Sequence, residues 1–91
     1  MLRLLIVDDE QIIREALSEM IDYQSLGYEL IGTAKNGMEA YDIICDEYPD
    51  VVITDIRMPI LNGLDLIEKT MKIDNNTTFI VLSGYGEFEY A

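Results

Sequence analysis

The sequence contains no histidine, one cysteine and only six basic residues, and each scarcity excludes a class of protein. With a single cysteine, Cys45, no internal disulfide can form, which fits a reducing compartment. Cys45 stands in a helical apolar pattern, so we predict a buried structural thiol rather than a reactive one. The 18 acidic residues bring the net charge to −12, a poor match for nucleic acid, whose phosphates are bound by Lys and Arg.

The chain also has no long hydrophobic run. Its first apolar run, residues 1–7, is too short for a signal peptide or a membrane span, and acidic residues follow at once. We therefore expect a cytoplasmic protein with no membrane partner. The length of 91 residues and the hydrophobic fraction of 49% predict one small globular domain, residues 1–91, with a thin margin of stability.

Short apolar runs alternate with helical periods along the chain. The predicted strands are residues 2–7, 28–34, 51–54 and 79–82. The predicted buried helix faces are Ile13, Ala16, Leu17, Met20 and Ile21, then Ala40, Tyr41, Ile44, Cys45 and Tyr48, then Leu64, Ile67 and Met71. Turns are expected at Ser25-Leu26-Gly27, where the first helix would end, at Asn36-Gly37 and at Asn62-Gly63. Strands that alternate with helices predict βαβ units and an α/β fold with a parallel sheet.

The last residues predict the start of another helix at Glu87, barely one turn before Ala91. One turn has no independent stability, so the pattern indicates a chain cut before its fold is complete. Strand 79–82 would then lie near an exposed edge, although its apolar sequence is typical of an interior strand. We expect the chain to associate through this edge, for example as a homodimer, or to be partly unfolded.

Acidic residues follow two of the predicted strands. Asp8 and Asp9 come after the first strand, and Asp55 comes after the third. Because carboxylates at neighbouring strand ends repel one another, they need a cation, and oxygen ligands without His or Cys select Mg²⁺ rather than zinc. A carboxylate beside that ion can attack phosphorus and form an acyl phosphate. Ser83, after the fourth strand, is placed to offer its hydroxyl to a phosphoryl oxygen.

Each of these residues also has an ordinary explanation. Asp8 and Asp9 stand where acids cap a helix and favour its dipole. Asp55 alone is a common turn residue, and Ser83-Gly84 is ordinary turn chemistry. Their occurrence at successive strand ends of one parallel sheet favours a site.

Three segments resemble the receiver domain of bacterial two-component response regulators, in the order and spacing of that family. They are residues 5–10 (LIVDDE), residues 54–59 (TDIRMP) followed by Asn62-Gly63, and residues 82–85 (LSGY). Residues 54–59 and 83–91 are similar to AraC/YesN-like receivers, which are joined to an AraC-type helix-turn-helix output domain. The resemblance implies a flavodoxin-like three-layer sandwich with strand order 2-1-3-4-5, of which this chain lacks the fifth strand and last helix. It also implies that any contact with DNA is made by the missing output domain.

The resemblance further implies a role for each site residue. Asp55 would accept a phosphoryl group from a sensor histidine kinase. Asp9, Asp55 and the backbone carbonyl of Arg57 would bind Mg²⁺, and Asp8 would act through a coordinated water. Ser83 would be the switch hydroxyl that moves toward the phosphoryl group. Phosphorylation would be stoichiometric, so we expect a signalling domain rather than an enzyme.

The most important departure from the family is the absence of a lysine that ends the fifth strand of receivers and of an aromatic switch residue on that strand, because this chain ends before both. Lys35, Lys69 and Lys72 are not at strand ends in the predicted pattern, so none replaces that lysine. Two other interpretations stay open. A Mg²⁺-dependent phosphohydrolase of the haloacid-dehalogenase type would use Asp55 as nucleophile, but it needs a second acid where this chain has Arg57. An interaction module whose acids only cap helices would have no affinity for Mg²⁺.

Overall fold

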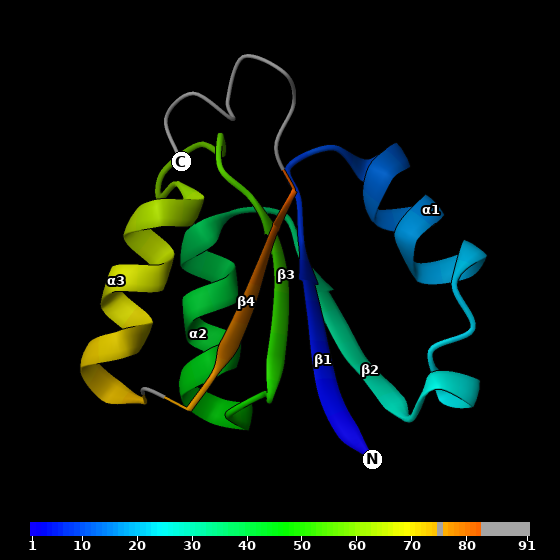
Figure 1. The fold of residues 1–91 in the computed structure, drawn as a ribbon. Coiled ribbons are helices and arrows are strands. Elements are labelled where there is room, and N and C mark those ends of the chain that lie inside the picture. The colour runs from blue at the N-terminus through cyan, green and yellow to red at the C-terminus, as the bar shows by residue number, and fades with distance from the viewer. Residues whose placement is uncertain (75, 83–91) are drawn as a thin grey trace.

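A computed structural model describes residues 1–74 and 76–82, where four parallel strands form one sheet in the order β2-β1-β3-β4 (Figure 1). The strands are β1 (Leu2–Val7), β2 (Tyr28–Ala34), β3 (Val51–Asp55) and β4 (Thr78–Leu82). The helices are α1 (Gln11–Met20), α2 (Gly37–Glu47) and α3 (Gly63–Ile73), with a short 3-10 helix, η1 (Gln24–Leu26), before β2. The predicted α/β class and the strand order 2-1-3-4 are confirmed. Ser83 and the helix expected from Glu87 lie outside the described residues.

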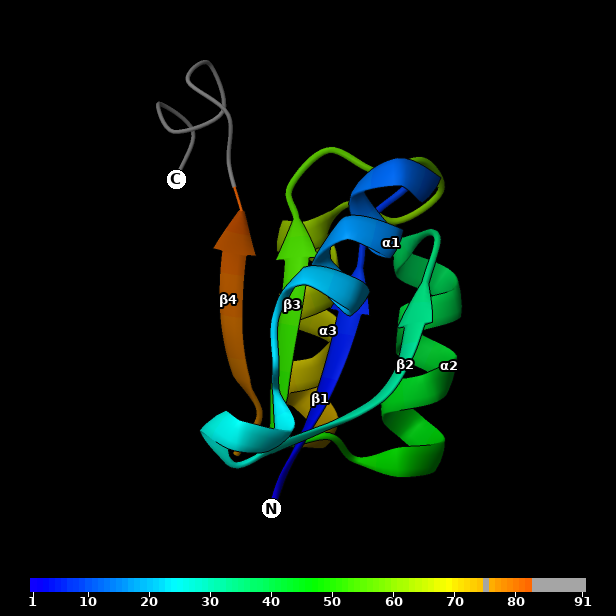
Figure 2. The same cartoon turned by 90° about the vertical axis from the view of Figure 1, so that its right-hand side faces the viewer.

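Helices cover both faces of the sheet, which gives the predicted three layers. Figure 1 shows α2 and α3 together on one face and α1 on the other. Figure 2, turned by 90°, shows α1 in front of the sheet with the strands behind it. Because the strands are parallel, their C-terminal ends share one edge of the sheet. Within the described ranges, no helix combines the length and the apolar character that a membrane span requires.

The pairing of the two central strands determines how the acidic residues at their C-terminal ends are aligned. Leu5, Ile6 and Val7 of β1 are fully buried, as expected for a strand covered on both faces. In the register of β1 with β3, Val7 pairs with Thr54. The next residues, Asp8 and Asp55, therefore leave neighbouring strands side by side.

The main core lies between the sheet and the pair α2 and α3. Its buried members are Leu5, Val7, Ala34, Ala40, Ile44, Val52, Met58 and Leu66. A smaller cluster on the α1 face contains Leu4, Ile6, Tyr23 and Val51. The larger core is therefore on the face that also carries the loop between β3 and α3.

The predicted face of α3 is wrong at two of its three residues, while Ile67 is half-buried. The buried residues of this helix are Gly63, Leu66 and Thr70, whereas Leu64 and Met71 are exposed. Gly63 explains the difference, because its Cα lies so close to the Asp55 carbonyl that an added Cβ would be 2.1 Å from that oxygen. This contact sets the rotation of the helix, and the residues three and seven positions after Gly63 then face the core.

The first helix is shorter than predicted. It ends at Met20 rather than near Ser25, and Met20 and Ile21 are exposed. Ile21 has extended backbone angles, which let the chain turn so that Tyr23 enters the core. The hydroxyl of Tyr23 then donates to the Leu17 carbonyl at 2.5 Å.

Three further expectations about burial need correction. Tyr48, predicted on the buried face of α2, is exposed and lies past the helix end with a φ of 46°. Cys45 is half-buried rather than buried. In β4, Ile80 and Leu82 are exposed, so one face of this strand is uncovered among the described residues, although its sequence is typical of an interior strand. Association through the β4 edge stays a prediction.

Candidate functional site

The carboxylates of Asp8, Asp9 and Asp55 meet at the C-terminal edge of the sheet. One oxygen from each lies within 4.8 Å of the others. β1 positions the first two residues and β3 ends with the third. The grouping expected from the strand ends is therefore present, and its oxygen-only donors fit a hard divalent cation.

Asp8 is the buried member of the cluster, with 2% of its surface exposed. Its backbone N–H donates to the Ala34 carbonyl at 3.1 Å, and its Oδ1 accepts the Glu10 N–H at 2.9 Å. Burial raises the pKa of the Asp8 carboxyl above its ordinary value of 3.8, and the charge of Asp9 adds to the rise. The Glu10 hydrogen bond and the positive charge of Arg14 lower the pKa without cancelling that rise.

Asp9 is exposed and borders an open pocket of about 460 Å³. The other residues that line this pocket are Ile56, Arg57, Met58, Pro59 and Asn62. The acidic cluster is thus approached from solvent past the loop between β3 and α3.

Asp55 is half-buried, and its carboxylate is oriented by its own loop. Its Oδ1 accepts the Ile56 N–H at 2.7 Å. The hydroxyl of Thr54, which is fully buried, donates to the Asp55 carbonyl at 2.9 Å. The Gly63 N–H donates to the Ile56 carbonyl at 2.8 Å, so the loop folds back tightly on the end of β3. Sequence reasoning missed Thr54, because its apolar neighbours indicate only a strand.

The same loop contains a strained turn. The Leu61 N–H donates to the Pro59 carbonyl at 2.8 Å, and Ile60 between them has a φ of 72°. This is a γ-turn with positive φ, which is rare and unfavourable for a β-branched residue. Ile60 is 79% exposed, so burial of its side chain does not explain the conformation. Close packing does hold the loop, since a Cβ on Gly37 would lie 2.0 Å from the Leu61 carbonyl oxygen.

Helix capping does not account for the acidic cluster. The N-cap residue of α1 is Glu10, which makes no side-chain cap hydrogen bond. The side-chain caps of α2 and α3 are Asn36 and Asn62, whose Oδ1 atoms accept the N–H groups of Glu39 and Asp65 at 2.8 Å. None of the three aspartates is the N-cap residue of a helix in the described part of the chain, although Asp8 Oδ1 accepts the N–H of Glu10, the N-cap residue of α1.

Two further predictions about the site concern Ser83 and Lys35. Ser83 lies outside the described residues, so its place relative to Asp55 stays a prediction. Lys35, which was not expected at a strand end, directly follows β2 and is exposed. Because β1 lies between β2 and β3, Lys35 is on the far side of the strand that carries Asp8.

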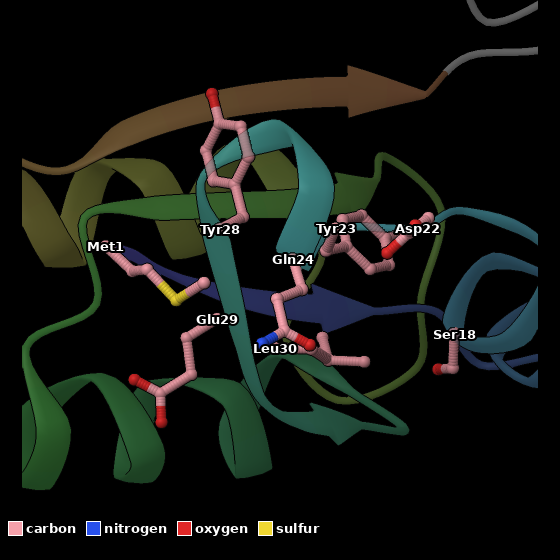
Figure 3. A pocket seen from close by; sticks show the side chains of 8 residues that line it. All are labelled: Met1, Ser18, Asp22, Tyr23, Gln24, Tyr28, Glu29 and Leu30. Carbon is pink, nitrogen blue, oxygen red and sulfur yellow. The ribbon is translucent and has the colours of Figure 1, made fainter.

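A second pocket, of about 510 Å³, lies at the start of β1 and β2, away from the acidic cluster (Figure 3). It is lined by Met1, Ser18, Asp22, Tyr23, Gln24, Tyr28, Glu29 and Leu30. It contains none of the predicted site residues. Size alone therefore does not identify the functional site of this protein.

Comparison with known proteins gives consistent matches. The family described as response regulator receiver domain matches residues 4–91. The uncharacterized transcriptional regulatory protein YesN of Bacillus subtilis is 50% identical over 91 residues, which are 100% of this chain and 25% of that protein. The chain thus spans about a quarter of the length of this curated relative.

Solved structures share the fold. The REC domain of AraT, a response regulator from Geobacillus stearothermophilus, has a TM-score of 0.92 at 38% identity, over 98% of this chain and 69% of that one. The CheX-CheY-BeF3-Mg+2 complex from Borrelia burgdorferi has a TM-score of 0.84 at 31% identity, over 98% of this chain and 66% of that one. The first of these structures is itself the receiver domain of a response regulator.

Proposed function

The chain belongs to the response regulator receiver family, and on this basis we propose that Asp55 accepts a phosphoryl group from the phosphohistidine of a sensor histidine kinase. One observation carries the proposal. Asp55 ends a central strand with its carboxylate within 4.8 Å of those of Asp8 and Asp9. Phosphorelay signalling is what the family does, and Asp55 is the member of the cluster that ends a strand next to an open pocket.

The proposed cofactor is Mg²⁺. Asp9, Asp55 and the backbone carbonyl of Arg57 are its proposed ligands, with Asp8 acting through a water. The oxygen-only cluster supports this choice, and so does the similarity to the CheX-CheY-BeF3-Mg+2 complex, which contains Mg²⁺. When bound, the cation neutralises charge on the carboxylates and on the phosphoryl oxygens.

In the proposed reaction an Asp55 carboxylate oxygen attacks phosphorus. A carbon-oxygen-phosphorus linkage forms, the phosphorus-nitrogen bond of phosphohistidine breaks, and the released imidazole nitrogen takes a proton. The Ile56 N–H on Oδ1 restricts rotation of the carboxylate, which lies within 4.8 Å of the carboxylates of Asp8 and Asp9. Ser83 is the proposed switch hydroxyl that responds to the new phosphoryl group. One phosphoryl group is accepted per chain, so the domain is not a turnover enzyme.

The partners and the location are proposals for the whole protein. We propose that phosphorylation controls an output domain outside this chain, which binds DNA, because the relative YesN is named as a transcriptional regulatory protein. A cytoplasmic location fits a domain that receives its phosphoryl group from a kinase. With 18 acidic residues and only six basic ones, the receiver itself is a poor match for nucleic acid.

Intact-mass spectrometry after incubation with acetyl phosphate and Mg²⁺ tests the function. The parent chain should gain the mass of one phosphoryl group, and Asp55→Asn should gain none. Asp50→Asn is the matched control, because Asp50 is an exposed aspartate at the opposite end of the sheet. Equal labelling of Asp55→Asn and the parent would contradict the assignment. Steady release of phosphate from a phosphomonoester would favour the phosphohydrolase alternative.

A further inference from the structure

Arg14 is the residue of α1 that reaches the acidic loop. Its guanidinium Nη1 donates a 2.7 Å hydrogen bond to the backbone carbonyl of Asp8. The side chain is half-buried, and the Arg14 N–H donates to the Glu10 carbonyl at 3.0 Å in the first turn of the helix. Arg14 therefore ties α1 to the loop that carries two of the three carboxylates.

The contact with Arg14 adds a hydrogen bond at the Asp8 carbonyl to those at its N–H and carboxylate. The Asp8 N–H is held by the Ala34 carbonyl and its carboxylate by the Glu10 N–H. The Asp8 carbonyl belongs to the planar peptide that joins Asp8 to Asp9. The orientation of this peptide sets the direction in which the Asp9 side chain leaves the backbone. A hydrogen-bond donor on the Asp8 carbonyl therefore restricts the direction of the Asp9 side chain through the peptide plane.

The apolar face of α1 is only partly buried. None of its residues is fully buried, although Leu17 packs against the smaller core cluster. At its C-terminal half, the Tyr23 hydroxyl donates to the Leu17 carbonyl at 2.5 Å. At its N-terminal half, the Arg14 contact with Asp8 has the corresponding role. These two polar contacts add to the partial apolar packing that positions the helix.

We propose that Arg14 is a positioning residue for the cation site, which holds the Asp8–Asp9 peptide so that the Asp9 carboxylate faces those of Asp8 and Asp55. This inference rests on the proposed function, since it assigns Arg14 a role in Mg²⁺ binding. Arg14 does not bind the metal, because a guanidinium has only donors. Its effect passes through the backbone of Asp8.

Two consequences of losing Arg14 have opposite signs. A positive charge near the carboxylates repels Mg²⁺, so loss of charge alone would strengthen Mg²⁺ binding. Loss of the hydrogen bond releases the Asp8–Asp9 peptide, which would weaken binding. The direction of the change in affinity therefore distinguishes a positioning residue from a nearby charge.

An NMR titration with MgCl₂ that follows the backbone amides of residues 8–10 tests the proposal. Arg14→Met should weaken Mg²⁺ binding by about tenfold, the lower range for residues that orient metal ligands. Arg14→Lys should recover most of the loss, because one ammonium donor is enough for one carbonyl. Arg14→Gln, with a shorter side chain, is the second variant if Arg14→Met does not fold. Lys72→Met is the charge control, because Lys72 is exposed in the last turn of α3.

The outcomes separate the two proposals. Arg14→Met or Arg14→Gln that binds Mg²⁺ as tightly as the parent, or more tightly, would overturn the positioning role. Arg14→Lys as weak as Arg14→Met would overturn it too, because the donor would then not matter. Equal weakening by Lys72→Met would show that the loss of affinity is not specific to Arg14 and would also overturn it. A parent chain with no Mg²⁺ titration at all would instead contradict the proposed function.

Discussion

The two ends of the sheet contain the same kinds of acidic residue in opposite situations. At the end where the strands begin, the Arg3 guanidinium pairs with the Glu47 carboxylate at 2.5 Å, and Asp50 Oδ2 accepts the Arg3 N–H at 2.8 Å. At the end where the strands finish, Asp8, Asp9 and Asp55 are grouped within 4.8 Å. At the first end the acidic side chains form hydrogen bonds or ion pairs with Arg3, and at the second end three carboxylates lie close to one another.

This difference indicates that the acidic end lowers the stability of the fold when no cation is bound. Acids that are paired one by one with donors contribute modest stability. Acids grouped together, one of them buried, are unfavourable until a cation joins them. The grouped end is held together instead by close backbone packing, in which Gly63 and Gly37 touch the loop after β3. Variants at the two ends should therefore respond differently.

The largest expected effect is at Gly63. Gly63→Ala would place a Cβ 2.1 Å from the Asp55 carbonyl oxygen, so β3 or α3 must move. We expect a loss of about 3 kcal/mol or more in the free energy of unfolding. Gly32→Ala is the matched control, because nothing lies within 4 Å of its added Cβ. Urea denaturation of both variants measures the difference, and equal midpoints would contradict the close packing of the acidic end.

Mg²⁺ should stabilise the parent by a smaller amount. At a concentration tenfold above its dissociation constant, a ligand that binds only the folded state adds about 1.4 kcal/mol. We expect this gain in the parent and a much smaller one in Asp9→Asn, whose amide replaces a proposed ligand. Thermal unfolding with MgCl₂, beside NaCl of equal ionic strength, measures it. A gain that Asp9→Asn and the parent share would place the cation elsewhere.

Matched Asn substitutions at the two ends should change stability in opposite directions. The folded-state pKa of Asp8 is raised, so the protonated carboxyl favours folding. Its contribution is fully present below the ordinary value of 3.8 and is lost as the pH rises through the raised value. Without metal at pH 7, Asp8→Asn should therefore be more stable than the parent.

Asp50→Asn should instead be less stable, by about 0.5–1 kcal/mol, because a charge-assisted hydrogen bond becomes a neutral one. Urea denaturation of both variants and the parent from pH 3 to pH 7 would follow the two differences. The advantage of Asp8→Asn should vanish at the acid end of the series. An advantage that is the same at every pH would contradict the burial of a charged Asp8.

The smallest expected effects are at Ile60 and Tyr48, the two non-glycine residues with positive φ in residues 1–74 and 76–82. Ile60 has a φ of 72° at the acidic end, and Tyr48 has a φ of 46° at the end of α2. Glycine at either position should stabilise the protein by up to about 1 kcal/mol, because it adopts positive φ without strain. Ile60→Gly should gain more, since Ile is β-branched. Equal urea midpoints for both variants and the parent would contradict strain at either site.

Much of the fold could be predicted because strands depend on local sequence. Residues 2–7 and 28–34 were predicted as strands and are β1 and β2 with the same bounds. The grouping of Asp8, Asp9 and Asp55 followed from their places after two apolar runs. Helix faces were less predictable. In α3, apolar residues occur on more than one side, and the contact of Gly63 with β3 selects which side is buried.

For two residues near the candidate site, the sequence did not indicate their hydrogen bonds. Thr54 is one residue of an apolar strand, yet its hydroxyl holds the Asp55 carbonyl. Arg14 is a common helix residue, yet its side chain reaches the Asp8 carbonyl. A hydrogen bond to a backbone carbonyl leaves no residue pattern, because every residue has that carbonyl.

The sequence by itself determined which segments form the parallel strands and that acidic residues follow β1 and β3. Both are properties of neighbours along the chain, since apolar runs and turn residues act within a few positions. Only the tertiary structure decided that Val7 pairs with Thr54, that Asp8 is buried and that Arg14 holds its carbonyl. Register, helix rotation and burial depend on contacts between segments that meet only when the sheet forms.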